Sequence, residues 1–562
     1  MFFGNIEIIF ILNIFLNYFY NFDYVSFTAF VTNYIGYNDP MIFKYEFPQT
    51  EIKRANFLAN NEFPDSFHFG VATSAYECEG AWNVTDKGES IWDYMTHSNS
   101  SLISDRTNGD VSSDFYHLYP DDIQFASNIG LNMIKISLSW SRILPDGNIN
   151  RISDSGISFY NRVIDEMLAN NITPMISLFD GDMPYFLQKL GGWTDPEIVD
   201  VFVEYASVAF MFFGDRVKYW VTIAEPTKIC RFGYGGIDIP AMNMPGVADY
   251  LCGHHMLLAH SKVYELYHQE YNPQGNNGKL GIINYYTWFV PERNTSELDV
   301  AAAERAHKFY NDWLTYPIFS QTGDYPEIMQ LLIDYKSYIA GFPLSRLPVF
   351  SPPEIERIRG SADFLGINYY TATSVEDYND DTKPVSFDKD ADIRQVETDR
   401  WIGETKIKIT PWGLTKLLHR LNNDYLLPEI WITNGYADSG SIMDWGRVVY
   451  HHKYLKAVLK AMQDGIDIQG YLVKSLTDGF EEMDGYKMKF GLFHVAFNTS
   501  DRTRLFKLST VLINDVAKTR IIRPLKEVYA DIEKFAKQLE ISKIVEFIVE
   551  FEQWDSALYP SF

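Results

Sequence analysis

Residues 219–226 read Tyr-Trp-Val-Thr-Ile-Ala-Glu-Pro. Six mainly apolar and β-branched residues are typical of a buried strand, and the Glu-Pro pair that follows ends the strand at a polar turn. Further along the chain, residues 253–271 have apolar positions that recur every three and four residues, which is the pattern of a helix. A strand followed by a helix is the repeating unit of an α/β fold.

The same alternation continues along the chain from about residue 62. Eight runs predict strands: Phe67–Thr73, Met133–Trp140, Pro174–Phe179, Tyr219–Ala224, Leu280–Tyr286, Phe364–Tyr370, Ile430–Thr433 and Gly470–Leu476. Helical periodicity marks Asp121–Ile129, Ser158–Asn170 and Asp195–Gly214 in addition to 253–271. Eight such units without a low-complexity linker predict one (β/α)₈ barrel, a TIM barrel of the α/β class, with long loops at its C-terminal face.

Composition and charge exclude several classes of protein. The chain has 562 residues, of which 46% are hydrophobic, so it has enough material for a large core and differs from disordered, collagen-like and polytopic membrane proteins. Its formal net charge of −26 repels nucleic-acid phosphates and anionic membranes. We therefore expect no nucleic-acid partner and no stable membrane insertion, and instead a small neutral or cationic ligand.

Some features of the sequence are typical of secreted proteins. The three cysteines allow one bridge, and a bridge between Cys230 and Cys252 would close a loop of about twenty residues. Residues 8–16 form an apolar run as long as a signal-peptide core, although no Lys or Arg precedes Lys44. We expect a secreted, glycosylated protein. Its sequons lie at Asn83, Asn99, Asn171, Asn294 and Asn498.

The sequence divides into three segments. Residues 1–61 form either a signal segment or an irregular extension, and residues 62–525 form the barrel. Residues 526–562 form a C-terminal extension in which 541–551 have helical periodicity. This helix would pack either against the barrel or against a partner.

Polar residues follow the predicted strands at their carboxyl ends, where barrel enzymes carry their chemistry. Any one carboxylate at such a place is most simply a helix cap or a solvated loop residue. Because these groups converge on one face of the barrel, they favour a functional site. No spacing of Cys and His residues matches a metal site, and we expect neither a metal nor a cofactor.

Five longer motifs carry a resemblance to a known family. They are Phe-Pro-Asp-Ser-Phe-His-Phe-Gly-Val-Ala-Thr-Ser-Ala-Tyr at 63–76, Ser-Leu-Ser-Trp-Ser-Arg-Ile-Leu-Pro-Asp-Gly at 137–147, Thr-Ile-Ala-Glu-Pro at 222–226, Asp-Phe-Leu-Gly-Ile-Asn-Tyr-Tyr at 363–370 and Met-Asp-Gly-Tyr-Lys-Met-Lys-Phe-Gly at 483–491. They resemble family 1 glycoside hydrolases, the β-glucosidase family, and most of all its insect members. The resemblance covers about 62–525 and implies a (β/α)₈ barrel, retaining hydrolysis of O-glycosyl bonds and a disulfide between Cys230 and Cys252.

Retaining hydrolysis needs two carboxyl groups about 5–5.5 Å apart, one as general acid and one as nucleophile. The resemblance makes Glu225 the acid/base candidate. The asparagine that precedes this glutamate in the family contacts the sugar 2-hydroxyl, and it is Ala224 here. The family motif Ile-Thr-Glu-Asn-Gly is shortened to Ile-Thr-Asn-Gly, so the nucleophile is absent near Thr433 and Asn434.

Other sugar-contacting positions also differ from the family. Lys135 takes the place of the arginine that pairs with the nucleophile, and Lys474 replaces a tryptophan. Carboxylates crowded into one cavity raise one another's pKa, so we expect some to be protonated at neutral pH. Because the departures concentrate at the site, they favour true loss over an error in the sequence. The substrate-binding candidates are Glu77, Asp180, Asn368, Tyr370, Glu481 and Glu482.

We interpret the chain as a β-glucosidase-like glycosyl hydrolase of carbohydrate metabolism whose hydrolysis of O-glycosyl bonds is lost or strongly impaired. One alternative is an active β-glycosidase of altered specificity, in which Glu225 is the acid and a displaced carboxylate, Glu77 or Asp180, activates water with inversion. Another is a non-catalytic ligand-binding or storage protein. The expected partner is a small-molecule glycoside or an altered ligand, and the sequence does not indicate the oligomeric state.

Overall fold

The computed structural model describes residues 61–236, 238–275, 278–380, 382–403 and 405–538. The expected signal segment and the helical pattern at 541–551 lie outside the described residues. By their contacts, the described residues fall into two units: 61–495 with 504–538, and the short loop 496–503. The barrel and the candidate site belong to the first unit.

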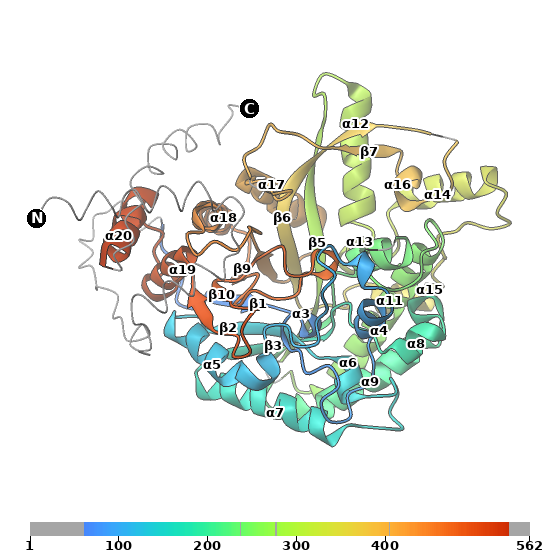
Figure 1. The fold of residues 1–562 in the computed structure, drawn as a ribbon. Helices are drawn as coiled ribbons and strands as arrows, with labels where there is room; N and C mark the ends of the chain where they lie inside the picture. Colours follow the sequence, from blue (N-terminus) through green and yellow to red (C-terminus); the bar gives the residue numbers. More distant parts are fainter. Residues whose placement is uncertain (1–60, 237, 276–277, 381, 404, 539–562) are drawn as a thin grey trace, which may run out of the picture. The chain divides into compact units, whose positions relative to one another are not determined.

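Eight parallel strands close into a ring, which confirms the predicted TIM barrel (Figure 1). They are β1 (His68–Ala72), β2 (Met133–Ser137), β3 (Thr173–Phe179), β4 (Tyr219–Ala224), β5 (Lys279–Pro291), β6 (Leu365–Asp377), β8 (Ile430–Asn434) and β9 (Ile468–Val473). The strand order is β5-β4-β3-β2-β1-β9-β8-β6, and pairing of β5 with β6 closes the ring. One further strand, β7 (Ile393–Val396), pairs antiparallel with β6.

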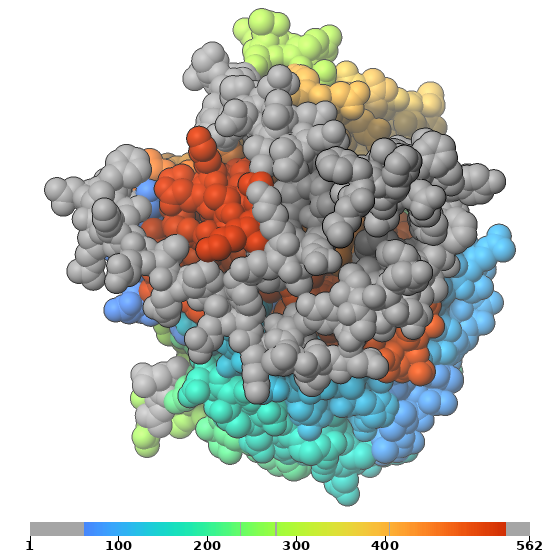
Figure 2. Space-filling model, turned by 60° about the vertical axis from the view of Figure 1, so that its left-hand side comes forward, coloured from blue at the N-terminus to red at the C-terminus, as the bar shows by residue number. Residues whose placement is uncertain are grey.

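Helices connect the strands, and each of the four helical patterns coincides with an observed helix. The larger helices are α5 (Phe115–Asn128), α7 (Asp154–Ala169), α9 (Ile198–Phe213), α11 (Ala248–Leu266), α12 (Glu297–Ala306), α14 (Glu327–Ile339), α17 (Pro411–Asp424), α18 (Trp445–Gln463), α19 (Leu508–Thr519) and α20 (Leu525–Gln538). In the part of the chain that the structure describes, no helix is both long and apolar enough to span a membrane. Figure 2 shows the red surface of the last helices above the turquoise surface of helices from the first half of the barrel.

Some predicted strand ends were wrong. The run predicted to continue to Trp140 ends at Ser137, because Trp140 already begins the short helix α6 (Trp140–Ile143). The last run ends at Val473 instead of Leu476. By contrast, β5 and β6 are longer than predicted, because their ends continue to pair with each other as far as Pro291 and Val375.

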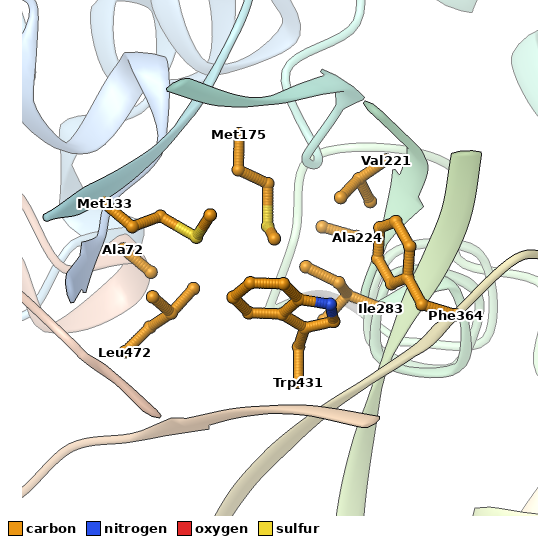
Figure 3. Close-up of a cluster of buried hydrophobic side chains, with 9 residues drawn as sticks. All are labelled: Ala72, Met133, Met175, Val221, Ala224, Ile283, Phe364, Trp431 and Leu472. Carbon is orange, nitrogen blue, oxygen red and sulfur yellow. The ribbon is translucent and has the colours of Figure 1, made fainter. Parts of the chain in front are cut away.

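Side chains from the strands and from their immediate ends fill the interior of the barrel (Figure 3). Met175 and Trp431 point toward each other there, and Trp431 is 1% exposed. Ala224, the residue before Glu225, belongs to the same hydrophobic cluster. The apolar layer thus reaches directly to the carboxyl ends of the strands, where the polar residues begin. The cluster consists of Ala72, Met133, Met175, Val221, Ala224, Ile283, Phe364, Trp431 and Leu472.

Candidate functional site

A polar cavity opens at the carboxyl ends of the barrel strands. The centres of water molecules can occupy about 60 Å³ in it. We call it the first cavity. Its polar and charged lining comprises Thr73, Ser74, Glu77, Lys135, Asp180, Glu225, Lys228, Asn368, Thr433, Lys474 and Glu482, and its aromatic lining comprises Tyr76, Trp92, Tyr370 and Phe480.

Glu225 lies where β4 turns into the short helix α10 (Pro226–Ile229), with a left-handed φ of 56°. The Asn368 side-chain amide donates a hydrogen bond of 2.8 Å to its Oε1, and the ammonium of Lys228 lies 3.1 Å from its Oε2. Burial alone would raise the pKa of Glu225, but the positive charge of Lys228 and the Asn368 hydrogen bond lower it below its usual value. The carboxyl is therefore held in its ionised form.

Lys228 is a site residue that sequence reasoning missed. Its Nζ also lies 2.7 Å from Oε1 of Glu482, so it joins carboxylates that follow β4 and β9. Burial would lower the pKa of this ammonium, but Glu225 and Glu482 raise it well above its usual value. The available signal was its position three residues after Glu225 on a helical turn, a spacing that brings two side chains together.

Lys474 forms a second group of ion pairs. Its Nζ lies 2.7 Å from Oε1 of Glu77 and 2.9 Å from Oε2 of Glu481. Glu77 also completes the capping box of α3 (Ala75–Cys78), whose N-cap is Ser74, because its Oε2 accepts a hydrogen bond of 3.2 Å from the Ser74 backbone N–H. Glu77 therefore combines the expected position in the site with the simpler role of a helix cap.

The carboxyl groups around these lysines differ in their pKa values. Burial and the nearby Glu77 raise the pKa of Glu481 to about 7 against the effect of Lys474. Burial likewise raises the pKa of Asp180, although Asp180 forms an ion pair with Lys135. At Glu77 burial acts in the same direction, but Lys474 outweighs it and the pKa is lowered. The predicted rise in pKa is thus found at Glu481 and Asp180, whereas the pKa of Glu77 is lowered.

The end of β8 brings a hydroxyl group to the cavity where the family carries a carboxylate. Alternate residues of a strand face opposite sides, so Trp431 and Thr433 face the interior while Asn434 faces outward. The Asn434 amide donates to the carbonyl of Tyr369 and lies 3.4 Å from the hydroxyl of Tyr450 on α18. Among the described residues, Thr433 is the only one from β8 that lines the first cavity.

The pairing of β8 with β9 contains an irregularity. Ile430 pairs with Ile468, but the next residue, Trp431, pairs with Gly470, so β9 uses one residue more than β8 over the same length. The extra residue lies in β9, whereas β8 pairs with β6 without a shift from Ile430 to Thr433. Thr433 lies two residues after the inward-facing Trp431, so Thr433, and not Asn434, faces the cavity.

Other polar residues near the strand ends belong to the framework. Arg142 Nε donates to Glu79 at 2.9 Å, and Lys507 Nζ lies 2.8 Å from Asp478, so these groups are satisfied by partners that do not line the first cavity. The expected disulfide is present: Cys230 and Cys252 are bridged, with a Cα–Cα distance of 5.5 Å. In the described part of the chain, no group of three or more His, Cys, Asp or Glu side chains could hold a metal ion.

Comparison with known proteins agrees with this architecture. The model of glycosyl hydrolase family 1 matches residues 59–521. Myrosinase 1 of Brevicoryne brassicae is 40% identical over 464 residues, which are 82% of this chain and 99% of that protein. Cytosolic beta-glucosidase of Cavia porcellus is 35% identical, with 79% and 95% of the two chains covered.

Solved structures give the same result. The structure of aphid myrosinase matches with a TM-score of 0.78 and 38% identity, covering 82% of this chain and 100% of that chain. A family 1 β-glucosidase from Thermotoga maritima matches with a TM-score of 0.74 and 31% identity, covering 83% and 99%. The similarity therefore extends over the whole barrel.

Proposed function

The chain belongs to glycosyl hydrolase family 1, and we propose that it is a β-glucosidase-like member in which hydrolysis of O-glycosyl bonds is lost or strongly impaired. The observation that carries the proposal is Thr433, which lines the first cavity at the end of β8. Retaining hydrolysis requires a carboxylate that attacks the anomeric carbon, and a threonine hydroxyl is a much weaker nucleophile that needs a general base to activate it. Loss of one member of a catalytic pair generally costs several powers of ten in rate.

The state of Glu225 supports the same proposal independently. A general acid works best when its pKa lies near the working pH, so that it holds a proton to donate. Lys228 and Asn368 lower the pKa of Glu225 and occupy its two oxygens. A departing glycosidic oxygen would therefore meet an ionised carboxylate that is already paired.

Sugar binding is also weakened in this proposal. The side chain of Ala224 lies in the hydrophobic core, 1% exposed, and it offers no hydrogen bond to a hydroxyl group. The ion pairs of Lys228 and Lys474 extend into the cavity, so a neutral pyranose would have to displace charged partners from one another. Separating buried ion pairs is costly, because each charge then lacks its partner.

The inverting alternative would use Glu77 or Asp180 to activate water. Glu77 is paired with Lys474, which lowers its pKa and makes it a weaker base. Asp180 has a raised pKa, but its ion pair with Lys135 engages the carboxylate that would have to hold the attacking water. We therefore rank this route below loss of hydrolysis. Proton NMR of the first product formed from a β-glucoside separates the two stereochemical outcomes: an α-anomer would support inversion, and a β-anomer would exclude it.

The test of the proposed function is hydrolysis of fluorogenic β-glucosides, β-galactosides and β-fucosides by the full chain. We expect no turnover above that of Glu225→Gln. A variant with Glu inserted between Thr433 and Asn434 should remain impaired, because Ala224 and Lys228 are unchanged. Turnover by the natural chain that Glu225→Gln abolishes would overturn the proposal.

We also propose that the protein is secreted and glycosylated. In support, the asparagines of all five sequons are exposed. Treatment of protein from a eukaryotic secretion host with an N-glycosidase should lower its mass. An unchanged mass would argue against glycosylation at these positions. The asparagines are Asn83, Asn99, Asn171, Asn294 and Asn498.

A further inference from the structure

A second cavity shares Lys228 with the first, and it is lined by the paired ends of β5 and β6 and by the segment that follows Glu225. The centres of water molecules can occupy about 80 Å³ in it. Tyr285 lines this second cavity and Tyr370 lines the first, and the two rings are stacked with centroids 5.9 Å apart. The stacked tyrosines thus contribute one ring to each of two cavities that share Lys228.

Arg231 is the most distinctive residue of the second cavity. Its side chain is 9% exposed, and its Nη2 donates a hydrogen bond of 2.9 Å to Oδ1 of Asp388. The centre of its guanidinium lies 3.9 Å from the ring centre of Tyr310 and 4.9 Å from that of Phe387. Two aromatic rings and an ion pair therefore hold the guanidinium in place.

One donor of this guanidinium is not used by the protein. The Nε–H of Arg231 is buried and has no hydrogen-bond partner among the described residues. A buried donor without a partner is costly, so such groups in native proteins generally have a hydrogen-bond partner, and one that the chain does not supply is a water molecule or a ligand. Arg231 lines the second cavity, which has room for such a partner.

The charged lining of the second cavity differs from that of the first. Its described lining contains two cationic residues, Lys228 and Arg231, and no carboxylate. Lys228 pairs with Glu225 and Glu482, and Arg231 pairs with Asp388, but none of these carboxylates lines the second cavity. Hydroxyl and amide groups on Thr287, Thr373 and Gln395 add further hydrogen-bonding capacity. The charged side chains that a ligand meets in this cavity are therefore cationic, which favours an anionic ligand.

We propose that the second cavity binds the oxyanion group of a small molecule, a carboxylate, sulfate or phosphate, and that the Nε–H of Arg231 is its charged donor. A charge-assisted hydrogen bond to an oxyanion satisfies the unpaired donor at a rigid guanidinium. The proposal rests on Arg231 and does not require that the first cavity hydrolyses glycosides, although Lys228, the partner of Glu225, lines both cavities.

Isothermal titration calorimetry of the full chain with sodium acetate, sulfate and phosphate tests this site. We expect saturable binding of at least one of the three anions with a stoichiometry of one. Acetamide has nearly the same shape as acetate and no charge, so it should bind at least about tenfold more weakly. Arg231→Met removes the donor and keeps an unbranched side chain, and it should weaken anion binding by at least about tenfold.

Arg394 provides a matched control. Its guanidinium lies 4.5 Å from the ring centre of Tyr378 and pairs with Glu376, but it lines neither cavity. Arg394→Met should leave anion binding unchanged. Thr287→Val is a second variant, milder for folding, and it should weaken binding several-fold.

Three results would overturn the proposal. The first is the absence of saturable binding for all three anions, which would leave water as the occupant. The second is equal binding of acetate and acetamide, and the third is anion binding that is unchanged in folded Arg231→Met. If Arg231→Met does not fold, the Thr287→Val variant decides: unchanged affinity in that protein would contradict the site.

Discussion

The ammonium of Lys228 lies 3.1 Å from Oε2 of Glu225, on the first helical turn after β4. Because Pro226 begins α10 directly after Glu225, the two side chains are three residues apart on one side of a short helix. The residue that the family uses as an acid is thus part of an ion pair, and Lys228 also contacts Glu482. The site is organised around lysine–carboxylate pairs.

Lys228→Met should raise the pKa of Glu225, because burial then acts against a weaker opposing charge. A ¹³C NMR titration of labelled glutamate carboxyls, assigned with Glu225→Gln, measures the change. Lys308→Met removes a comparable pair with Asp312 away from the cavity and should leave this pKa unchanged. A Glu225 pKa that is unaffected by Lys228→Met would show that the ion pair does not control it.

The same pair predicts a pH dependence of stability. A carboxyl whose pKa is lowered by folding stabilises the native state above its unfolded pKa of about 4.3, and this contribution is lost as the pH falls through the folded pKa. The advantage of the natural chain over Lys228→Met, on the order of 3 kcal/mol for a buried pair, should therefore shrink below about pH 4.3. Urea unfolding at pH 7 and at pH 3.5 measures this difference in the free energy of unfolding. A difference that grows on acidification would contradict the predicted direction of the pH dependence.

Glu481 should have the opposite dependence. Burial raises its pKa to about 7, so its contribution to stability is greatest below about pH 4.3 and is lost as the pH rises through 7. Glu481→Gln cannot ionise and should therefore gain stability relative to the natural chain between pH 5 and pH 8, by about 3 kcal/mol at most. Denaturant unfolding at both pH values tests this. Glu304→Gln, at an exposed carboxyl that pairs with Arg420, is the control and should give no such gain.

The disulfide should stabilise the segment that carries Glu225. Cys230 follows α10 directly, and its bridge to Cys252 at the start of α11 closes a loop with a sequence separation of 22. Replacing both cysteines by alanine should cost about 2–4 kcal/mol in the free energy of unfolding. Cys78→Ser, at the buried free cysteine, is the control for thiol counting. Labelling of three thiols in the unfolded, unreduced natural chain would disprove the bridge.

Trp431 should be a major contributor to the core. It is 1% exposed, and its ring lies 5.2 Å from that of Tyr219 and 5.3 Å from that of His68. Trp431→Ala should cost about 3–5 kcal/mol, because it removes buried apolar surface and leaves a cavity. Thermal unfolding measures the loss. Trp401 is only partly buried and contacts Trp412, so Trp401→Ala should lower the free energy of unfolding by less than Trp431→Ala. An equal loss in the two variants would contradict the major contribution of Trp431 to the core.

The sequence was sufficient to predict the barrel, because apolar runs such as Tyr219–Ala224 coincide with buried strands. It also predicted which polar groups lie together, since the carboxyl ends of parallel strands meet on one face. Lys228 was missed because its side chain enters the site from α10 and not from a strand end. Which face of a strand points into the barrel depends on its pairing with neighbouring strands, so the position of Thr433 at the cavity is visible only in the structure.

The pKa values also required the structure. Sequence reasoning treated the carboxylates as one group with mutually raised pKa values. The outcome at each residue depends on which side chains are nearest: Glu225 has Lys228 and Asn368, while Glu481 shares Lys474 with Glu77. Two carboxyls in one cavity therefore differ in the direction of their shift.

The most direct measurement of the central claim is release of dinitrophenolate from a 2,4-dinitrophenyl β-glucoside by the full chain. This leaving group departs without a proton, so its release requires no general acid and reports on the nucleophile alone. With Thr433 at the end of β8, we expect the rate with protein to equal the rate in buffer. Release of many equivalents of dinitrophenolate per chain by purified protein, with retention at the anomeric carbon, would contradict the loss of the nucleophile.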